Sequence, residues 1–410
     1  MNPVTVALVG CGGMGLRHLR AYAALHAAGN PDVRLTAVCD GDPGRRAAAV
    51  AAYRDLTGET LPAVADLADL ADRPDVDAVD IAVPTHLHAP LTVRAFAQGH
   101  HVLVEKPIAL TVAAARTMAA AAGRAGRVLA VAENFRRVAG NRAVRGLLAA
   151  GALGTPYFTT AQLSLPAALL HPEGGGEWYR DRTRSGSLVA LEMGVHEMDL
   201  LQYWFGPAVT VDATVHTYEP EIVHADGRRT PVTSEDTCLG RVSFAGGVHA
   251  QLTLTMAGHG EVVGNRLLVG SAGSLTSTCW ENWQGGWLTT DHGVREPLDD
   301  RVRRWVADLP AEVRDRLFPT GTWNPADLTV DVADPVRYGI AHEIVDFARA
   351  VRTGVPPETG APEAIRALAA AIALLESSAA RAEVAVADVL DGTVSTWQQS
   401  LDDAPTTSAA

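Results

Sequence analysis

The sequence of 410 residues contains almost no lysine. Lysine and arginine together number 34, and the only lysine is Lys106, so the other 33 are arginines. Arginine stays protonated in proteins, whereas lysine is a compact cation that can lose and regain a proton. Lys106 follows the apolar run 102–104 and Glu105 and precedes Pro107, which is typical of the end of a buried strand. Lys106 therefore serves either an ion pair with Glu105 or chemistry that arginine cannot perform.

Positive charge, long apolar runs and cysteine are also scarce, and each shortage excludes a class of protein. The net charge of −13 disfavours binding to nucleic acid or to an anionic membrane. No run of about 18 apolar residues occurs, so we expect no membrane-spanning helix, and the first residues lack the basic segment of a signal peptide. The four cysteines have no metal-ligand spacing, so we expect no metal and a reducing, cytoplasmic environment.

A glycine-rich turn stands near the start of the chain. The apolar run 4–9 leads into Gly10-Cys11-Gly12-Gly13-Met14-Gly15, and a helical pattern follows. Between a strand and a helix, the first of these glycines permits a tight turn, the second lets the backbone approach a pyrophosphate, and the last lets the helix pack closely on the strand. The free N–H groups of the helix N-terminus attract phosphates. The segment therefore predicts a dinucleotide-binding turn.

An acidic residue ends the second apolar run, 33–39. At this place the carboxylate of Asp40 can accept hydrogen bonds from both ribose hydroxyls, and it repels a 2′-phosphate. We therefore expect NAD as the cofactor and NADP as the less favoured one. Arg45 and Arg46 lie just beyond Asp40 and could reach a phosphate.

Strands and helices continue to alternate up to the strand-like run 128–132. Alternation of this kind predicts an α/β Rossmann domain, a doubly wound parallel sheet, over residues 1–134. Such sheets bind their ligands at the carboxyl ends of the strands. The residues that we expect to bind the cofactor are Gly10, Gly12, Gly13, Met14, Gly15, Asp40, Pro84, Thr85, His88, Glu105, Lys106 and Asn134.

The pattern changes in residues 135–390, which we expect to form a substrate-binding and oligomerisation domain. Five strand-like runs between 156 and 269, with mostly short connections, predict an antiparallel sheet. A helix-like run, 188–205, carries Glu192, His196 and Asp199 at spacings of four and three, which places them on one helix face. An acid four residues before a histidine can hold one imidazole nitrogen and leave the other to face a substrate. The alternative is a buried histidine with a structural role.

Three motifs carry a family resemblance: the glycine turn with Asp40, Glu105-Lys106-Pro107, and the segment from Glu192 to Asp199. In that order and at these separations they resemble the glucose–fructose oxidoreductase/inositol dehydrogenase (Gfo/Idh/MocA) oxidoreductases. The resemblance implies a Rossmann domain followed by an α+β domain with a large, mostly antiparallel open sheet. It also implies a homodimer or homotetramer that acts on a secondary alcohol or ketone of a sugar or cyclic polyol.

The same resemblance implies roles for individual residues. Lys106 and His196 would be catalytic, with His196 as general base, Glu192 orienting its imidazole, and Lys106 stabilising the alkoxide. Glu192 stands where the inositol dehydrogenases usually have Asp, so the exact substrate does not carry over. The residues expected at the substrate are Lys106, Arg180, Glu192 and His196.

The main hypothesis is an NAD-dependent dehydrogenase of a sugar, glycoside or cyclic polyol. The alternatives are a glycosidase that uses tightly bound NAD for transient oxidation and elimination, and a non-enzymatic NAD-sensing regulator.

A tryptophan-rich insertion is expected at 280–335. It contains Trp280, Trp283, Trp287, Trp305 and Trp323, which either cap a sugar site or anchor the insertion to the sheet. Residues 338–384 resemble the C-terminal helices of the family, and residues 391–410 form a polar tail.

Overall fold

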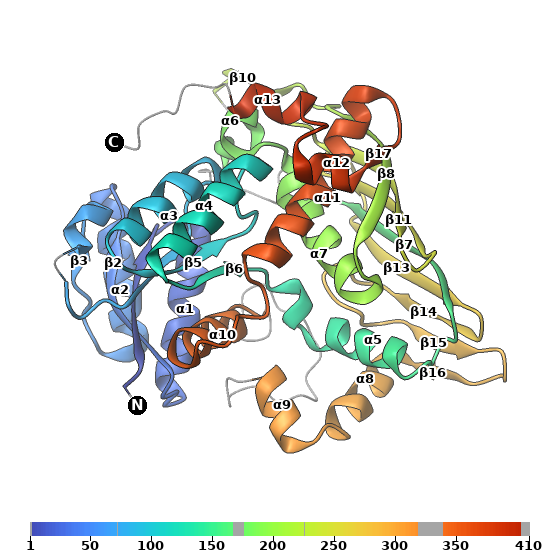
Figure 1. Ribbon diagram of the computed structural model, residues 1–410, viewed down its shortest axis with the longest axis horizontal. Coiled ribbons are helices and arrows are strands. Elements are labelled where there is room, and N and C mark those ends of the chain that lie inside the picture. Colours follow the sequence, from blue (N-terminus) through green and yellow to red (C-terminus); the bar gives the residue numbers. More distant parts are fainter. Residues whose placement is uncertain (1, 72, 167–175, 225, 319–338, 403–410) are drawn as a thin grey trace.

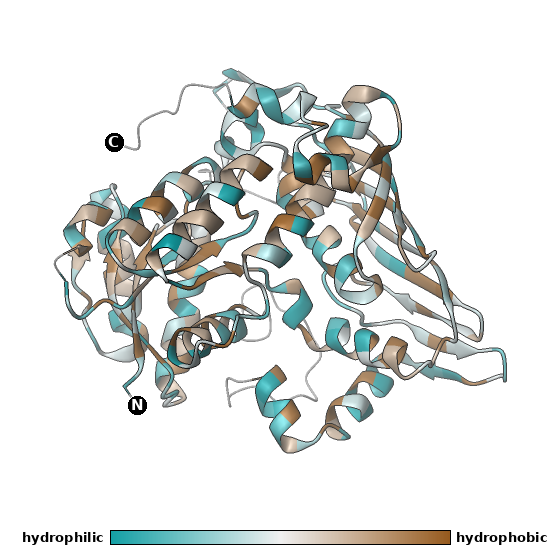
Figure 2. Ribbon diagram, viewed as in Figure 1, coloured by the Kyte–Doolittle hydropathy of each residue, from teal (hydrophilic) through white to brown (hydrophobic). Residues whose placement is uncertain are grey.

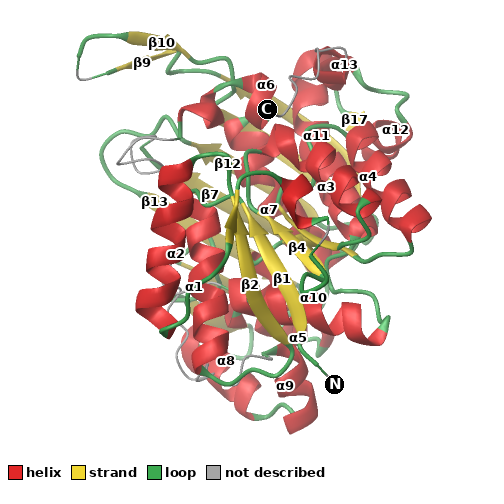
Figure 3. Ribbon diagram, turned by 90° about the vertical axis from the view of Figure 1, so that its left-hand side faces the viewer, coloured by secondary structure: helices red, strands yellow, loops and turns green. Residues whose placement is uncertain are grey.

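The first sheet contains six parallel strands in the order β3-β2-β1-β4-β5-β6. A computed structural model describes residues 2–71, 73–166, 176–224, 226–318 and 339–402 of the chain (Figure 1). The strands are β1 (Val4–Val9), β2 (Val33–Cys39), β3 (Ala63–Val64), β4 (Ala78–Ile81), β5 (His101–Glu105) and β6 (Leu129–Ala132). Figure 3 shows α1 (Gly13–Ala27) and α2 (Pro43–Thr57) on one side of this sheet, with α3 (His88–Ala97) and α4 (Val112–Ala125) on the other. The predicted doubly wound parallel sheet is confirmed.

Local sequence signals set the ends of these helices. Asp42 caps α2 by accepting a hydrogen bond from the N–H of Arg45, and Thr111 caps α4 by accepting one from Ala114. Both helices then end at a glycine with positive φ, 79° at Gly58 and 61° at Gly126, a backbone conformation that glycine adopts without a steric penalty. None of the helices in the described ranges has the length and apolar character needed to cross a membrane.

The second sheet has nine strands in the order β16-β15-β14-β13-β7-β12-β11-β8-β17. Neighbouring strands are antiparallel except for β7 and β12, which are parallel. The strands are β7 (Pro156–Ser164), β8 (Ala208–His216), β11 (Thr237–Phe244), β12 (His249–Thr255), β13 (Val263–Gly270), β14 (Gly273–Ser277), β15 (Trp287–Thr290), β16 (Arg295–Pro297) and β17 (Val384–Ala385). A hairpin of β9 (Glu221–Val223) and β10 (Arg229–Pro231) projects from the domain (Figure 3). The expected large, mostly antiparallel sheet is confirmed.

Helices cover one face of the second sheet. They are α5 (Ala139–Ala149), α7 (Gly194–Phe205) and α11 (Ala361–Ala380), and Figure 1 shows α7 and α11 between the sheet and the first domain. Figure 2 shows hydrophobic residues along α11 and along the strands behind it, and most of the side chains of α11 are buried. This burial joins the two domains through a continuous apolar core.

The C-terminal helices divide between the two domains. We expected residues 338–384 to lie together in the second domain. Instead α10 (Ile340–Thr353) packs on α1, and its apolar face, with Ile344 and Phe347, shares a core cluster with β1 and β2. Of the two helices, α11 is the one that packs on the second sheet, and the range ends at its strand β17. The physical reason is the apolar stripe of α10, which fills the groove beside the first sheet.

The last part of the chain is more ordered than expected for a polar tail beginning at 391. After α12 (Val386–Asp391), helix α13 (Thr396–Asp402) docks through buried Trp397 and Gln398. The side-chain oxygen of Gln398 accepts a hydrogen bond from the N–H of Val112, at the start of α4. Residues 403–410 lie outside the described ranges.

The tryptophan-rich segment forms the far edge of the second sheet. It supplies β15 and β16 and then α8 (Leu298–Ala307) and α9 (Ala311–Leu317). Trp280 and Trp283 are fully buried, whereas Trp287 is 41% exposed. Trp323 and the rest of the predicted insertion up to 335 fall outside the described residues. The described part of the insertion is therefore anchored to the sheet, which is the second of the two interpretations given for its tryptophans.

Candidate active site

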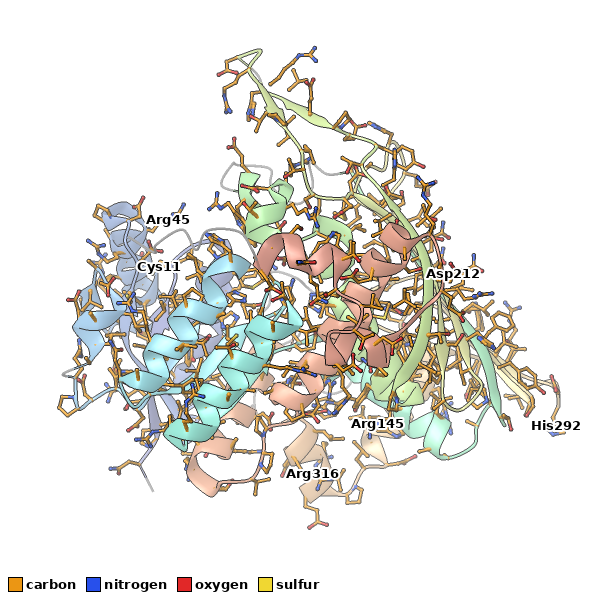
Figure 4. The ribbon with its side chains drawn as sticks, turned by 45° about the horizontal axis from the view of Figure 1, so that its top comes forward. Cys11, Arg45, Arg145, Asp212, His292 and Arg316 are labelled. Atoms are coloured by element: carbon orange, nitrogen blue, oxygen red, sulfur yellow. The ribbon has the colours of Figure 1, made fainter. Side chains whose placement is uncertain are left out.

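A cavity of about 1040 Å³ lies between the two domains, at the carboxyl ends of the parallel strands. Its walls include most of the residues selected from the sequence, and they come from both domains: Gly10, Gly12, Gly13, Met14, Asp40, Pro84, Thr85, Glu105, Lys106, Asn134, Glu192 and His196. Gly15, His88 and Arg180 do not line it. Figure 4 labels Cys11, from the glycine turn, and Arg45, from α2, both on the first domain.

The glycines of the turn divide into two structural roles. Gly10 has a φ of 98°, and a Cβ there would lie 2.3 Å from the carbonyl oxygen of Ala82. A Cβ on Gly15 would lie 1.9 Å from the carbonyl oxygen of Gly10, so Gly15 serves helix packing rather than direct contact with a ligand. Around Gly12 and Gly13 no atom lies within 4 Å of such a Cβ, and α1 begins there without a side-chain cap. The open backbone N–H groups fit the pyrophosphate of a dinucleotide.

The carboxylate of Asp40 is held in place before any ligand binds. One oxygen accepts a hydrogen bond from the N–H of Cys11 and the other from the N–H of Asp42, both at 2.8 Å. Each oxygen keeps a lone pair for a ribose hydroxyl. The side chain of Arg46 is engaged with the carbonyl oxygen of Asp40, whereas Arg45 lines the cavity. Arg45 is therefore the better placed of the two arginines to meet a phosphate.

Lys106 is joined to Glu192 rather than standing alone. Its Nζ donates a hydrogen bond to the backbone carbonyl of Glu192 at 2.8 Å and lies 3.4 Å from Oε2 of the same residue. The other carboxylate oxygen of Glu192 accepts a hydrogen bond from the hydroxyl of Thr85 at 2.6 Å. Burial raises the pKa of Glu192, although the cation of Lys106 opposes the shift. Glu192 thus positions Lys106 and does not contact the imidazole of His196.

His196 pairs with a different acid, which the sequence analysis did not select. Its Nδ1 lies 2.7 Å from Oε1 of Glu133, and no described residue hydrogen-bonds its Nε2. The imidazole stacks on the ring of Phe135 with a centroid distance of 4.0 Å. Burial alone would raise the pKa of Glu133, but the facing imidazole and its hydrogen bond outweigh burial and lower it. Glu133 is therefore ionised at neutral pH and can stabilise an imidazolium.

A π-helical turn explains why helical spacing selected the wrong acid. Residues Leu188–Met193 form this turn, in which the N–H of Glu192 bonds the carbonyl of Ser187, five residues earlier. The wider turn rotates Glu192 away from the face that the α-helix α7 gives to His196. The available signal for Glu133 was its place directly after β6, at the carboxyl edge where the ligand binds.

Two other expected contacts lie elsewhere. His88 is buried, and its ring nitrogens lie 2.8 Å from the carbonyl oxygen of Pro107 and 2.9 Å from that of Val83. It therefore ties together two loops of the cofactor site instead of facing the cofactor. Arg180 also turns away, with Asp236 and Glu219 as the nearest opposite charges. Arg184, four residues further along the chain on α6 (Arg182–Ser185), lines the cavity.

Aromatic side chains form the wall of the cavity in the second domain. Trp178 and Tyr179 stack at a centroid distance of 3.7 Å, and Trp280 meets the ring of Phe135 edge-on at 5.1 Å. The Trp280 segment is fixed by Arg266, whose Nε donates to the Trp280 carbonyl at 2.8 Å and whose guanidinium forms a fully buried pair with Glu197. The buried tryptophans thus anchor the segment, and Trp280 also presents an apolar surface next to His196.

Comparisons with known proteins agree with this division of the chain. Residues 4–133 match the model of an oxidoreductase family with an NAD-binding Rossmann fold, and residues 141–276 match the GFO/IDH/MocA C-terminal domain. Levoglucosan dehydrogenase in complex with NADH and L-sorbose has the same fold, with a TM-score of 0.78, 23% sequence identity, and coverage of 94% of this chain and 99% of that one.

Curated relatives share a substantial part of the sequence. The 1,5-anhydro-D-fructose reductase of Ensifer adhaerens is 36% identical over 190 residues, which are 46% of this chain and about half (53%) of the relative. The dTDP-3,4-didehydro-2,6-dideoxy-alpha-D-glucose 3-reductase of Streptomyces violaceoruber is 32% identical over 282 residues, 67% of this chain and 73% of the relative. With its Rossmann turn, its open sheet and these matches, the chain belongs to the GFO/IDH/MocA family of NAD-binding oxidoreductases.

Proposed function

We propose that the protein transfers a hydride between a secondary alcohol of a sugar, glycoside or cyclic polyol and the nicotinamide of NAD. The observation that carries this proposal is that Lys106 and His196 line one cavity, with Glu133 paired to the imidazole, beside a turn built for a dinucleotide. A sensor needs the dinucleotide turn but has no use for a base with its own carboxylate. The names of the relatives, an anhydrofructose reductase and a dTDP-sugar reductase, support a carbohydrate substrate.

Each residue has a chemical task in this reaction. Bound NAD supplies the acceptor for the hydride. His196 takes the hydroxyl proton through Nε2, and ionised Glu133 stabilises the imidazolium that results. The ammonium of Lys106 donates a hydrogen bond to the same substrate oxygen and stabilises its developing negative charge. Glu192 and Thr85 hold Lys106 toward the cavity, and the aromatic wall packs against the C–H faces of the substrate.

A screen of NAD reduction over inositols, aldoses, glycosides and nucleotide sugars tests the proposal. A dehydrogenase accumulates NADH in proportion to product. A glycosidase that oxidises its substrate transiently would release product without accumulating NADH. Binding of NAD without turnover of any of these compounds, in either direction, would favour the sensor.

We also propose that the protein is a cytoplasmic homodimer or homotetramer that associates through the face of the second sheet not covered by helices. That face exposes the apolar side chains of Phe158, Leu239 and Trp287. The four cysteines are free thiols, which fits a reducing compartment. Light scattering coupled to gel filtration measures the oligomeric state, and a monomer at micromolar concentration would contradict this part of the proposal.

We expect NAD to be preferred over NADP by at least tenfold in kcat/KM, about 1.4 kcal/mol. The preference follows from the two backbone hydrogen bonds that fix the Asp40 carboxylate where a 2′-phosphate would sit. Steady-state kinetics with both cofactors measure this preference, and the Asp40→Ala variant should have a smaller one. Equal use of NADP by the wild-type enzyme would mean that Arg45, which lines the cavity, outweighs Asp40.

Trp280→Ala is expected to raise the KM for the carbohydrate about tenfold, because the substrate loses an aromatic surface in a desolvated pocket. The KM for NAD should change little, since the dinucleotide turn lies on the other domain. Trp283→Ala is the matched control, because Trp283 is a buried tryptophan of the same segment and does not line the cavity. Equal effects of the two substitutions would show that Trp280 serves only the stability of the sheet edge.

A further inference from the structure

A buried polar cluster lies behind Lys106, on the side of the first sheet covered by α1 and α10. The imidazole of His18, on α1, is held between Oδ2 of Asp80 at 2.8 Å and Oε1 of Glu105 at 3.0 Å. Glu343, on α10, brings a third carboxyl group, and one ligand atom each of His18, Glu105 and Glu343 lie within 4.8 Å of one another. All four side chains are buried. None of them has a role in the reaction described above, although Glu105 lines the cavity.

The charges of this cluster come closer to balance if one carboxyl group keeps its proton, because the imidazolium of His18 then faces two carboxylates instead of three. Burial opposes a charged His18, but Asp80 and Glu105 outweigh burial and raise its pKa well above the usual value, so His18 is an imidazolium. Burial also opposes an ionised Glu105, yet the bond to His18 lowers its pKa. Burial raises the pKa of Glu343 well above its usual value, and the Glu105 charge adds to the shift. Glu343 is therefore the group that keeps the proton.

The surroundings of Glu343 agree with a neutral acid. The titratable and charged groups that face it are His18 and Tyr22 from α1, Glu105 from β5, and Glu133 and Arg137 from the segment after β6. The two carboxylates repel an ionised Glu343, and His18 is already shared by Asp80 and Glu105. The Oε2 atom of Glu343 is buried and has no hydrogen-bond partner among the described residues. A protonated carboxyl group is a hydrogen-bond donor, and the acceptor carboxylate of Glu105 has an oxygen within 4.8 Å of Glu343.

We propose that Glu343 is a positioning residue that, as a neutral acid, holds Glu105 and through it the backbone of Lys106. The link is the second oxygen of Glu105, which accepts a hydrogen bond from the N–H of Lys106 at 2.9 Å. An ionised Glu343 would push Glu105 toward the cavity and move the strand end that carries Lys106. The part of this proposal that concerns turnover rests on the proposed function, whereas the part that concerns protonation does not.

Two substitutions separate the neutral acid from other roles. Glu343→Gln keeps an uncharged hydrogen-bond donor of the same size, so kcat should stay within about twofold of wild type and the affinity for NAD should be unchanged. Glu343→Met keeps the volume but removes the donor, so kcat should fall about tenfold or more with NAD affinity still within about threefold of wild type. Equal damage by Gln and Met would overturn the proposal, because the ionised carboxylate would then be the functional form.

The pH dependence of thermal unfolding tests the protonation without any substrate. Because the pKa of Glu343 is raised in the folded state above the ordinary value of 4.5, the wild type loses stability as the pH rises from that value toward the folded pKa. The Glu343→Gln variant has no carboxyl proton to lose. Its Tm should therefore rise relative to the Tm of wild type by about 1–2 °C per pH unit in this pH window. Glu312→Gln, at an exposed acid on α9, is the control and should show no such trend. A flat Tm difference for Glu343→Gln would overturn the proposal.

Metal analysis of the purified wild-type protein closes the test. One equivalent of bound metal that is lost in Glu343→Gln would replace the neutral-acid proposal by a metal centre. Metal-free protein with the expected Tm trend would support the proposal even if the carbohydrate screen found no substrate.

Discussion

His196→Ala is expected to lower kcat by about 10³, or about 4 kcal/mol, because the substrate hydroxyl loses its general base. The Nδ1 atom of His196 is occupied by Glu133 at 2.7 Å, so only Nε2 is available to take the proton. The affinity for NAD should stay within about threefold of wild type, since the dinucleotide turn is untouched. Single-turnover kinetics with a substrate from the screen measure the chemical step directly.

Two double-mutant cycles identify the acid that serves His196. Glu133→Gln keeps a hydrogen bond but cannot stabilise an imidazolium, so we expect a loss of about 10² in kcat. The double variant with His196→Ala should be little worse than His196→Ala alone, because residues that act as one unit are not additive. Glu192→Gln combined with His196→Ala should give additive losses, since Glu192 acts on Lys106. The reverse pattern would show that Glu192 orients the base in the working enzyme.

Lys106→Arg is expected to lower kcat by about 10² or more while NAD still binds, because a compact, titratable cation is replaced by a larger, permanently charged one. The side chain of Lys106 is only 12% exposed, and its Nζ is held 2.8 Å from the carbonyl oxygen of Glu192. A guanidinium cannot take this position without displacing Glu192 or the substrate oxygen.

Lys106→Met is the companion variant, because it removes the charge and keeps an unbranched side chain. It should lose at least as much activity as Lys106→Arg, and both should bind NAD with an affinity near that of wild type. Turnover of Lys106→Arg close to wild type, together with an inactive Lys106→Met, would mean that positive charge alone is sufficient. That result would show that the site does not require a compact, titratable cation and that the role of Lys106 is electrostatic.

The features that the sequence alone determined are those with local causes. The glycine turn needs a positive φ at Gly10 and open backbone at Gly12, and each requirement concerns adjacent residues. Alternating apolar runs and helices predicted the parallel sheet and therefore the edge at which Asp40 and Lys106 meet the cavity. Lys106 drew attention by composition, because a chain that otherwise uses arginine keeps lysine at this one strand end.

The features that only the tertiary structure decided depend on contacts between distant residues. Glu133 and His196 are 63 residues apart, and Thr85 and Glu192 are 107 apart, so helical or strand periodicity could not pair them. The π-helical turn before α7 turned Glu192 toward Lys106, and a single wider turn leaves no clear trace in hydrophobic spacing. In the same way, α10 packs on the first domain because its apolar stripe fits beside α1, and this packing places Glu343 next to Glu105, the residue before Lys106. Periodicity states which face of an element is buried, but the partner of that face is set by which packing buries the most apolar surface and leaves the fewest charges unpaired.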